Sequence, residues 1–143
     1  MRRAAPAMAE RGWGRIVNVA SSSGKRPGQS NVAYSVAKAG QLSLSRAFAD
    51  AYAGRGVAIN AIAPGPTSTG LWTGDGGLAD QAAAAKGTTR DEALAAAAAK
   101  LPRGTLGTPE EIADVVVFLC SERAANVAGA AWSVDGGAVN VII

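Results

Sequence analysis

Short apolar runs and longer stretches of helical character alternate along the chain. The runs at 15–20, 57–63 and 129–134 have the pattern of strands that are covered on both faces. Between the first two runs, the segment 31–53 is long enough for a major helix, with Ser30 or Asn31 available as its N-cap. Strand, helix and strand in this order form a βαβ unit, whose two strands are parallel. The pattern therefore predicts an α/β fold of about three strands.

Other helices are predicted on either side of this unit. Residues 2–11 are typical of a helix end, because Gly12 and Gly14 follow. A further helix begins at Thr108, where Thr-Pro-Glu-Glu matches a capping box with proline at the first helical position. The tail at 138–143 is apolar and uncharged, so we expect it to be buried, in one interpretation against another subunit.

The segment 70–100 lacks strand character. Its glycines are followed by one or two alanine-rich helices, and Thr89 with Glu92 matches a capping box. An irregular insertion of this length beside a crevice is often a lid, with Leu71 and Trp72 as its apolar contacts. A plain connecting helical hairpin is the alternative interpretation.

Composition narrows the possible chemistry. A chain of 143 residues forms at most one domain, and its 48% apolar residues allow a modest core. The single cysteine excludes an internal disulfide and argues against structural zinc, and the lack of histidine excludes Ser-His-Asp triads. No apolar run has the length of a membrane span or of a signal peptide, so we expect a cytoplasmic protein that needs no metal.

Charge is distributed unevenly along the chain. Residues 1–60 hold nine Lys/Arg against two acidic residues (net +7), and residues 61–143 hold five against nine (net −4). The basic residues are scattered and match no nucleic-acid motif, so we interpret them mainly as a solvated surface. Attraction of an anionic nucleotide cofactor or of an acidic carrier protein is the alternative.

Three residues near the first βαβ unit can perform carbonyl chemistry together. Tyr34 and Lys38 lie four residues apart and share one face of the predicted helix, while Ser21 ends the first strand. A neighbouring ammonium favours the phenolate, so Tyr34 could exchange a proton with a carbonyl oxygen that Ser21 holds. The hydride must come from a cofactor. Taken alone, however, Tyr-x-x-x-Lys is a weak motif that also fits an ordinary helix with a solvated lysine.

A second polar turn is expected beside Ser21. The strand 57–63 runs into Pro64, Gly65 and Pro66, followed by Thr67, Ser68 and Thr69. Because the carboxyl ends of parallel strands meet at one edge of the sheet, this turn and Ser21 should flank one crevice. By itself the turn could also be an ordinary surface turn fixed by proline.

Together these motifs resemble the short-chain dehydrogenase/reductase family, and in particular its branch similar to oxoacyl-carrier-protein reductases. Ser21 lies thirteen residues before Tyr34, Tyr34 to Lys38 fits Tyr-x-x-x-Lys, and residues 60–65 fit Asn-x-x-x-Pro-Gly. Thr69 stands four residues after the glycine, and residues 107–113 and 134–137 fit the last helix and the closing strand. The resemblance covers essentially the whole chain, but only the C-terminal part of the family's domain.

The resemblance implies a doubly wound, Rossmann-like sheet and an NAD- or NADP-dependent oxidoreductase that acts on a small-molecule carbonyl or secondary alcohol. It implies that Ser21, Tyr34 and Lys38 are catalytic, and that Tyr34 and Lys38 also bind the cofactor together with Pro64, Gly65, Thr67 and Thr69. The segment 70–103 would be the substrate loop within a partial domain at 1–143. The helix 31–53 would pair with its copy in a homodimer or homotetramer.

The family's glycine-rich phosphate-binding turn is not found in these 143 residues. We therefore expect an incomplete chain, in which the nucleotide-binding half is absent and the strand 15–20 leaves an apolar sheet edge exposed. The alternative function is a catalytically inactive fragment or an oligomerisation module that retains the motifs.

Overall fold

A three-stranded parallel sheet forms the centre of the protein, whose computed structural model describes residues 1–29 and 31–140. The strands are β1 (Gly14–Val19), β2 (Val57–Pro64) and β3 (Ala131–Val134), in the order β1-β2-β3. Gly14 pairs with Val57, and Ala61 pairs with Ala131. The predicted strands and their parallel pairing are confirmed, with ends that shift by at most two residues.

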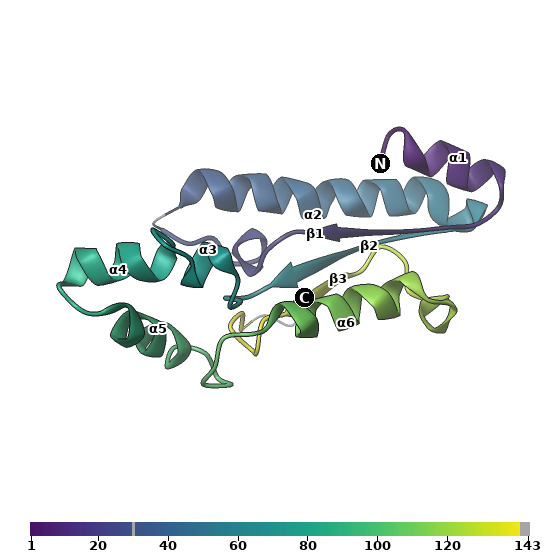
Figure 1. Cartoon of the computed structure of the whole chain (residues 1–143). Coiled ribbons are helices and arrows are strands. Elements are labelled where there is room, and N and C mark those ends of the chain that lie inside the picture. The colour runs from purple at the N-terminus through teal and green to yellow at the C-terminus, as the bar shows by residue number, and fades with distance from the viewer. Residues whose placement is uncertain (30, 141–143) are drawn as a thin grey trace.

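Helices cover both faces of the sheet, which gives three layers (Figure 1). On one face lie α1 (Ala4–Glu10) and α2 (Val32–Tyr52), and on the other lies α6 (Pro109–Cys120). β2 is buried from Val57 to Ala63, and its side chains alternate between the two layers. Ile59 packs in the cluster on the α1 and α2 side, whereas Ile62 packs with Leu119 of α6. Coverage of both faces explains why β2 is apolar without interruption.

The ends of α2 follow from local hydrogen bonds. The Asn31 side chain caps the helix by accepting a hydrogen bond from the Tyr34 N–H (3.2 Å). Ser30, the other predicted cap, lies outside the described residues. At the far end, a short 3-10 turn, η2 (Ala53–Arg55), leads to Gly56, whose φ of 79° lies in the left-handed region that favours glycine. The predicted helix 31–53 is thus confirmed.

Three helices follow β2 and precede α6 along the chain. In space they lie beyond the carboxyl ends of the strands (Figure 1). They are α3 (Gly70–Thr73), α4 (Leu78–Lys86) and α5 (Arg90–Ala98). The two alanine-rich helices and both capping boxes, Thr89 with Glu92 and Thr108 with Glu111, are confirmed. We call the segment 70–98 the helical cap. The short α3 was not predicted, because four residues carry no helical period.

Two features concern the boundaries of the molecule. β1 pairs with β2 alone among the described strands, and Val19 at its end is 49% exposed, as expected for an apolar edge. In the tail, Ala138 and Val139 are half-buried, while the predicted burial of 141–143 concerns residues outside the described ones.

Within the described part of the chain, no helix combines the length and the hydropathy that crossing a bilayer requires.

Candidate functional site

A cavity of about 650 Å³ opens at the carboxyl ends of β1 and β2. This volume lies within the usual range for ligand sites, roughly 300–1,000 Å³. Every residue predicted for the site lines this cavity: Ser21, Tyr34, Lys38, Pro64, Gly65, Thr67 and Thr69. The segments that the sequence placed at one sheet edge therefore do meet there.

Ser21 is positioned by the turn that follows β1. Its hydroxyl oxygen accepts a hydrogen bond from the Ser23 N–H (3.1 Å) and so caps the 3-10 turn η1 (Ser22–Gly24). This turn lies directly on α2: a Cβ at Gly24 would stand only 2.8 Å from the Lys38 carbonyl carbon. The absence of a side chain at Gly24 thus lets the serine-bearing turn approach the helix that carries the other two groups.

Tyr34 and Lys38 come from the first two turns of α2. The Lys38 Nζ donates to the Val19 carbonyl oxygen (3.1 Å) and to the Gln41 Oε1 (3.2 Å). The same ammonium lies 5.6 Å from the centroid of the Tyr34 ring, within the range of a cation–π contact. Tyr34 is 40% exposed, so its ring is open to a ligand in the cavity.

The turn after β2 is held between β3 and the loop before α6. The Gly65 N–H donates to the Val134 carbonyl oxygen (3.1 Å), and the Thr67 hydroxyl donates to the Gly65 carbonyl oxygen (3.0 Å). A Cβ at Gly65 would stand 2.8 Å from the Cα of Asp135. Glycine is therefore required here by packing within the chain, independently of any ligand. Thr69 stands at the N-cap of α3.

Several residues line the cavity without having been predicted for it, and four of them lie at the N-terminal ends of helices. Asn31 does so while capping α2, and Leu78 extends from the start of α4. Pro109 and Ile112 belong to the first turn of α6. The capping motif of α6 was visible in the sequence, but only the folded chain shows that this helix starts at the cavity. Leu71 and Trp72, the predicted apolar contacts, also line it.

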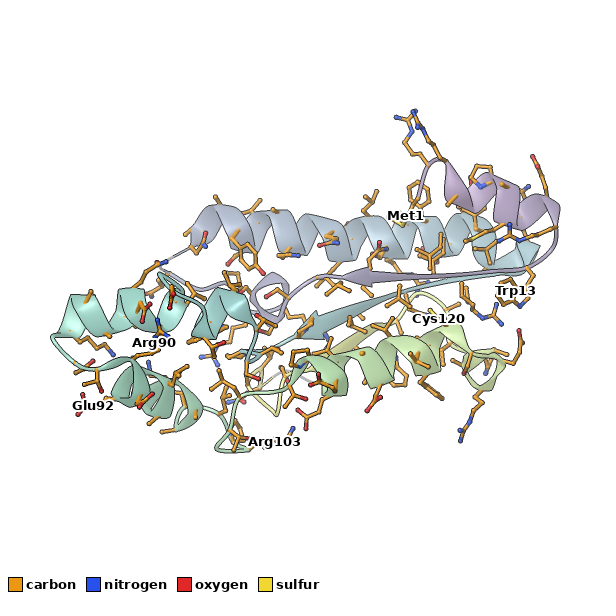
Figure 2. The ribbon with its side chains drawn as sticks, in the orientation of Figure 1. Met1, Trp13, Arg90, Glu92, Arg103 and Cys120 are labelled. Carbon is orange, nitrogen blue, oxygen red and sulfur yellow. The ribbon has the colours of Figure 1, made fainter. Side chains whose placement is uncertain are left out.

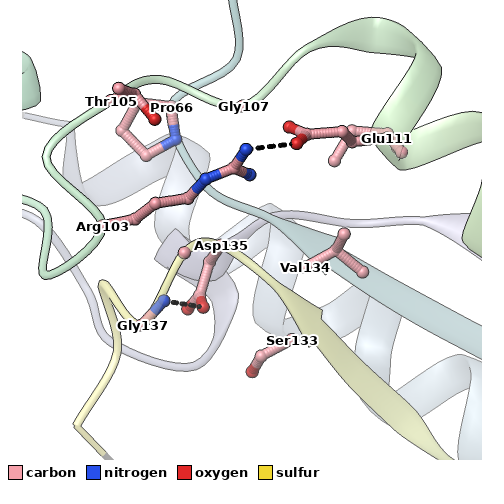
Figure 3. Close-up of a pocket in the computed structure, with 11 residues that line it drawn as sticks. Pro66, Arg103, Thr105, Gly107, Glu111, Ser133, Val134, Asp135 and Gly137 are labelled. Atoms are coloured by element: carbon pink, nitrogen blue, oxygen red, sulfur yellow. Dashed lines mark hydrogen bonds and ion pairs between the residues drawn. The ribbon is translucent and has the colours of Figure 1, made fainter.

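A smaller cavity of about 230 Å³ is lined by Pro66 of the turn after β2 together with Arg103 and Glu111 (Figure 3). These two side chains form an ion pair. The hydrogen bond from Arg103 and a second one from the Thr108 N–H hold the pKa of Glu111 below its ordinary value. Of the turn predicted to flank the crevice, Pro66 lines this cavity too, but none of the predicted catalytic or cofactor-binding residues does, so we place the candidate site in the larger one.

Known proteins with similar sequences were found over nearly the whole chain. Residues 1–139 match the family described as enoyl-(acyl carrier protein) reductase. The 2-(S)-hydroxypropyl-CoM dehydrogenase 3 of Xanthobacter autotrophicus is 44% identical over 131 residues, which are 91% of this chain and 48% of that protein. The inactive 2-(S)-hydroxypropyl-CoM dehydrogenase 2 of the same organism is 38% identical over 131 residues (91% and 53%).

Solved structures are similar as well. The L-sorbose reductase from Gluconobacter frateurii, complexed with NADPH and L-sorbose, matches with a TM-score of 0.89 and 32% identity, covering 99% of this chain and 53% of that one. The chain thus spans about half the length of the relatives that it matches. Sequence and fold agree, and the chain belongs to the short-chain dehydrogenase/reductase family.

Proposed function

We propose that this chain carries the catalytic portion of an NAD(P)-dependent oxidoreductase that interconverts a carbonyl compound and a secondary alcohol. One observation carries the proposal. Ser21, Tyr34 and Lys38 come from two different segments, yet they line a single cavity together with the Pro64–Thr69 turn. A phenol, a hydroxyl and an ammonium are the groups that such a reaction needs around the reacting oxygen.

The groups in the cavity fit a nicotinamide nucleotide. An ammonium has three donors, and the structure gives the Lys38 Nζ two acceptors, so one donor remains for a ribose hydroxyl. The Pro64–Thr69 turn offers hydroxyl and main-chain groups beside Lys38, suited to a carboxamide. When bound, the nicotinamide supplies a hydride to a carbonyl carbon or accepts one from an alcohol. The solved relative described above contains NADPH.

The chain's own residues handle the substrate oxygen. In the reducing direction, the Ser21 hydroxyl donates a hydrogen bond to the carbonyl oxygen and stabilises the negative charge that develops there. Tyr34 transfers its phenolic proton to that oxygen as the carbon gains the hydride, which yields the alcohol and a phenolate. The Lys38 ammonium near the ring stabilises this phenolate. In the oxidising direction, the phenolate takes the proton back.

Replacing Tyr34 tests this assignment. Because general acid catalysis contributes roughly 10²–10⁴-fold, Tyr34→Phe should lower NADPH-dependent ketone reduction by at least about 100-fold. Tyr52→Phe is the matched control, since Tyr52 lies at the other end of the same helix and stacks on Phe48. The turnover rates of both variants are measured from the loss of NADPH absorbance. A Tyr34→Phe protein as active as the Tyr52→Phe protein would refute the assignment.

A non-catalytic function is the second candidate, and one observation favours it. A relative that is 38% identical over 91% of this chain bears the name of an inactive protein. Titration of the chain with NADPH, followed by nicotinamide fluorescence, separates the candidates. Saturable binding that is weakened in a Lys38→Met variant supports the oxidoreductase, whereas absence of binding favours the inactive form.

We also propose that two copies of the chain associate through α2. Its outer face carries exposed Val32, Val36 and Leu44, and Val36 is 66% exposed. Exposed apolar side chains in a continuous stripe on one helix are typical of a contact between subunits. The small residues Gly40 and Ala47 lie on the same stripe and allow close approach of a second helix.

A further inference from the structure

Most side chains that line the large cavity are uncharged. Among its described lining residues, Lys38 alone is ionic. Its ammonium already donates to the Val19 carbonyl and to Gln41, and the proposed function assigns its remaining donor to a ribose hydroxyl. A carboxylate, phosphate or sulfonate entering the cavity would therefore lose its hydration without gaining a cation of its own.

The two arginines of the neighbouring segments do not supply that cation. Arg90 of α5 donates from Nε to Asp80 Oδ1 and from Nη2 to Asp80 Oδ2 (2.6 Å each), and from Nη2 to Asp75 (3.0 Å). Two carboxylates against one guanidinium leave this cluster with a formal charge of −1. Arg103 forms its ion pair with Glu111. Both arginines are thus engaged within the chain, and neither lines the large cavity.

The side of the cavity formed by the helical cap is apolar. Leu71 and Trp72 of α3 and Leu78 of α4 line it, and Ile112 of α6 lines it as well. Leu71 is 63% exposed, so a ligand in the cavity would cover apolar surface that now faces water. An indole ring gives a flat surface on which aromatic and alicyclic groups stack favourably.

We propose that the site selects uncharged ketones and secondary alcohols whose body is aromatic or alicyclic, and that it excludes substrates with an anionic group close to the reacting carbon. This inference rests on the proposed function, because it assumes that the reacting oxygen lies at Ser21 and Tyr34. The apolar body then extends over Leu71 and Trp72.

A matched pair of ketones tests the selectivity by binding alone. Methyl 3-benzoylpropanoate and 3-benzoylpropanoate share the same phenyl ketone and differ in whether the far end is an ester or a carboxylate. Calorimetric titration of the full chain in the presence of NADP⁺, which cannot reduce a ketone, gives both dissociation constants. The ester should bind at least about ten-fold more tightly. Equal or tighter binding of the carboxylate, or no saturable binding of the ester, would overturn the inference.

Two variants locate the binding surface. Leu71→Arg places a cation on an exposed wall position and should reverse the preference in favour of the carboxylate. Trp72→Ala should weaken ester binding by about ten-fold, whereas Trp13→Ala should leave it unchanged, because Trp13 lies at the opposite end of the molecule from Arg90 and the helical cap (Figure 2). An unchanged preference in Leu71→Arg would contradict the placement of the substrate body.

The outcomes distinguish this inference from the proposed function. If the wild-type chain binds the ester selectively but Tyr34→Phe does not affect turnover, the proposed function fails and the selectivity stands. If turnover depends on Tyr34 but the carboxylate is the better ligand, the proposed function stands and the selectivity is refuted.

Discussion

At the scale of single residues, Gly24 shows how a position without chemistry can determine the geometry of the site. Its Cα lies so close to the backbone of α2 that an added Cβ would stand 2.8 Å from the Lys38 carbonyl carbon and 2.9 Å from its oxygen. Backbone atoms within a long helix cannot move aside easily. A side chain here must therefore displace the turn that begins at Ser21.

We accordingly predict that Gly24→Ala destabilises the fold and impairs the site. Overpacking of this kind costs about 1–3 kcal/mol, measured as the free energy of unfolding in denaturant. Turnover should fall as well, because Ser21 moves away from Tyr34. Gly28→Ala is the control in the same loop, since a Cβ there would meet nothing within 4 Å. Indistinguishable Gly24→Ala and Gly28→Ala proteins would contradict this account.

The sequence predicted which of these residues meet at one edge of the sheet, but not how they contact one another. Helical spacing and the geometry of parallel strands were enough to bring Ser21, Tyr34 and Lys38 to one edge, because both are local regularities. The bond from Lys38 to the Val19 carbonyl and the close approach of Gly24 join segments across a loop. Such contacts depend on how the layers pack, which no spacing in the sequence expresses.

At the scale of elements, the helical cap is held together by Arg90. This side chain connects the start of α5 with Asp80 of α4, with Asp75 in the preceding turn and with the Thr73 carbonyl of α3. The hydrogen bonds from Arg90 and from the Gly76 N–H hold the pKa of Asp80 below its ordinary value of 3.8. Arg90 therefore links the three short helices directly.

This shift predicts how the helical cap responds to acid. Because the Asp80 pKa is lower in the folded state, the unfolded state binds more protons in acid, and the contribution of Asp80 to stability is complete above about pH 4. This contribution is lost as the pH falls through the lowered pKa that Asp80 has in the folded state. The protection factors of the α4 and α5 amides, in which the exchange rates are corrected for their intrinsic dependence on pH, should therefore fall in that window.

In the variant Asp80→Asn, the α4 and α5 amides should be poorly protected from hydrogen exchange already at neutral pH. Their protection should change little in acid, because the variant has no carboxylate at position 80 to protonate. Asp91→Asn is the control, because Asp91 lies in the first turn of α5 and its substitution leaves the Arg90 cluster intact. Equal protection of the helical cap in wild type and Asp80→Asn at pH 7 would refute the role of the cluster.

The elements themselves were predicted to different degrees. The strands and α2 were found because apolar runs and length are strong signals, and α5 and α6 because their capping boxes mark a start. α3 was missed because its four residues begin with Gly70 and are followed by Gly74, a pattern that also fits a turn. The Arg90 cluster was missed because its residues are ten and fifteen positions apart.

At the scale of the whole molecule, α2 links the site to the proposed association of two copies. Val36→Glu places a charge in the middle of the exposed apolar stripe and should shift the chain from dimer or tetramer to monomer in analytical ultracentrifugation. Ala85→Glu is the control at an exposed position on α4. A wild-type chain that is monomeric, or a Val36→Glu chain that remains associated, would contradict the proposal.

The most direct test of the whole account is transfer of a labelled hydride. The chain is incubated with NADPH deuterated at C4 on the transferable face and with methyl 3-benzoylpropanoate, and the alcohol product is analysed by mass spectrometry and NMR. We expect one deuterium on the carbinol carbon with the wild-type chain, and almost no product with Tyr34→Phe. Product without deuterium, or equal labelled product from both proteins, would contradict it.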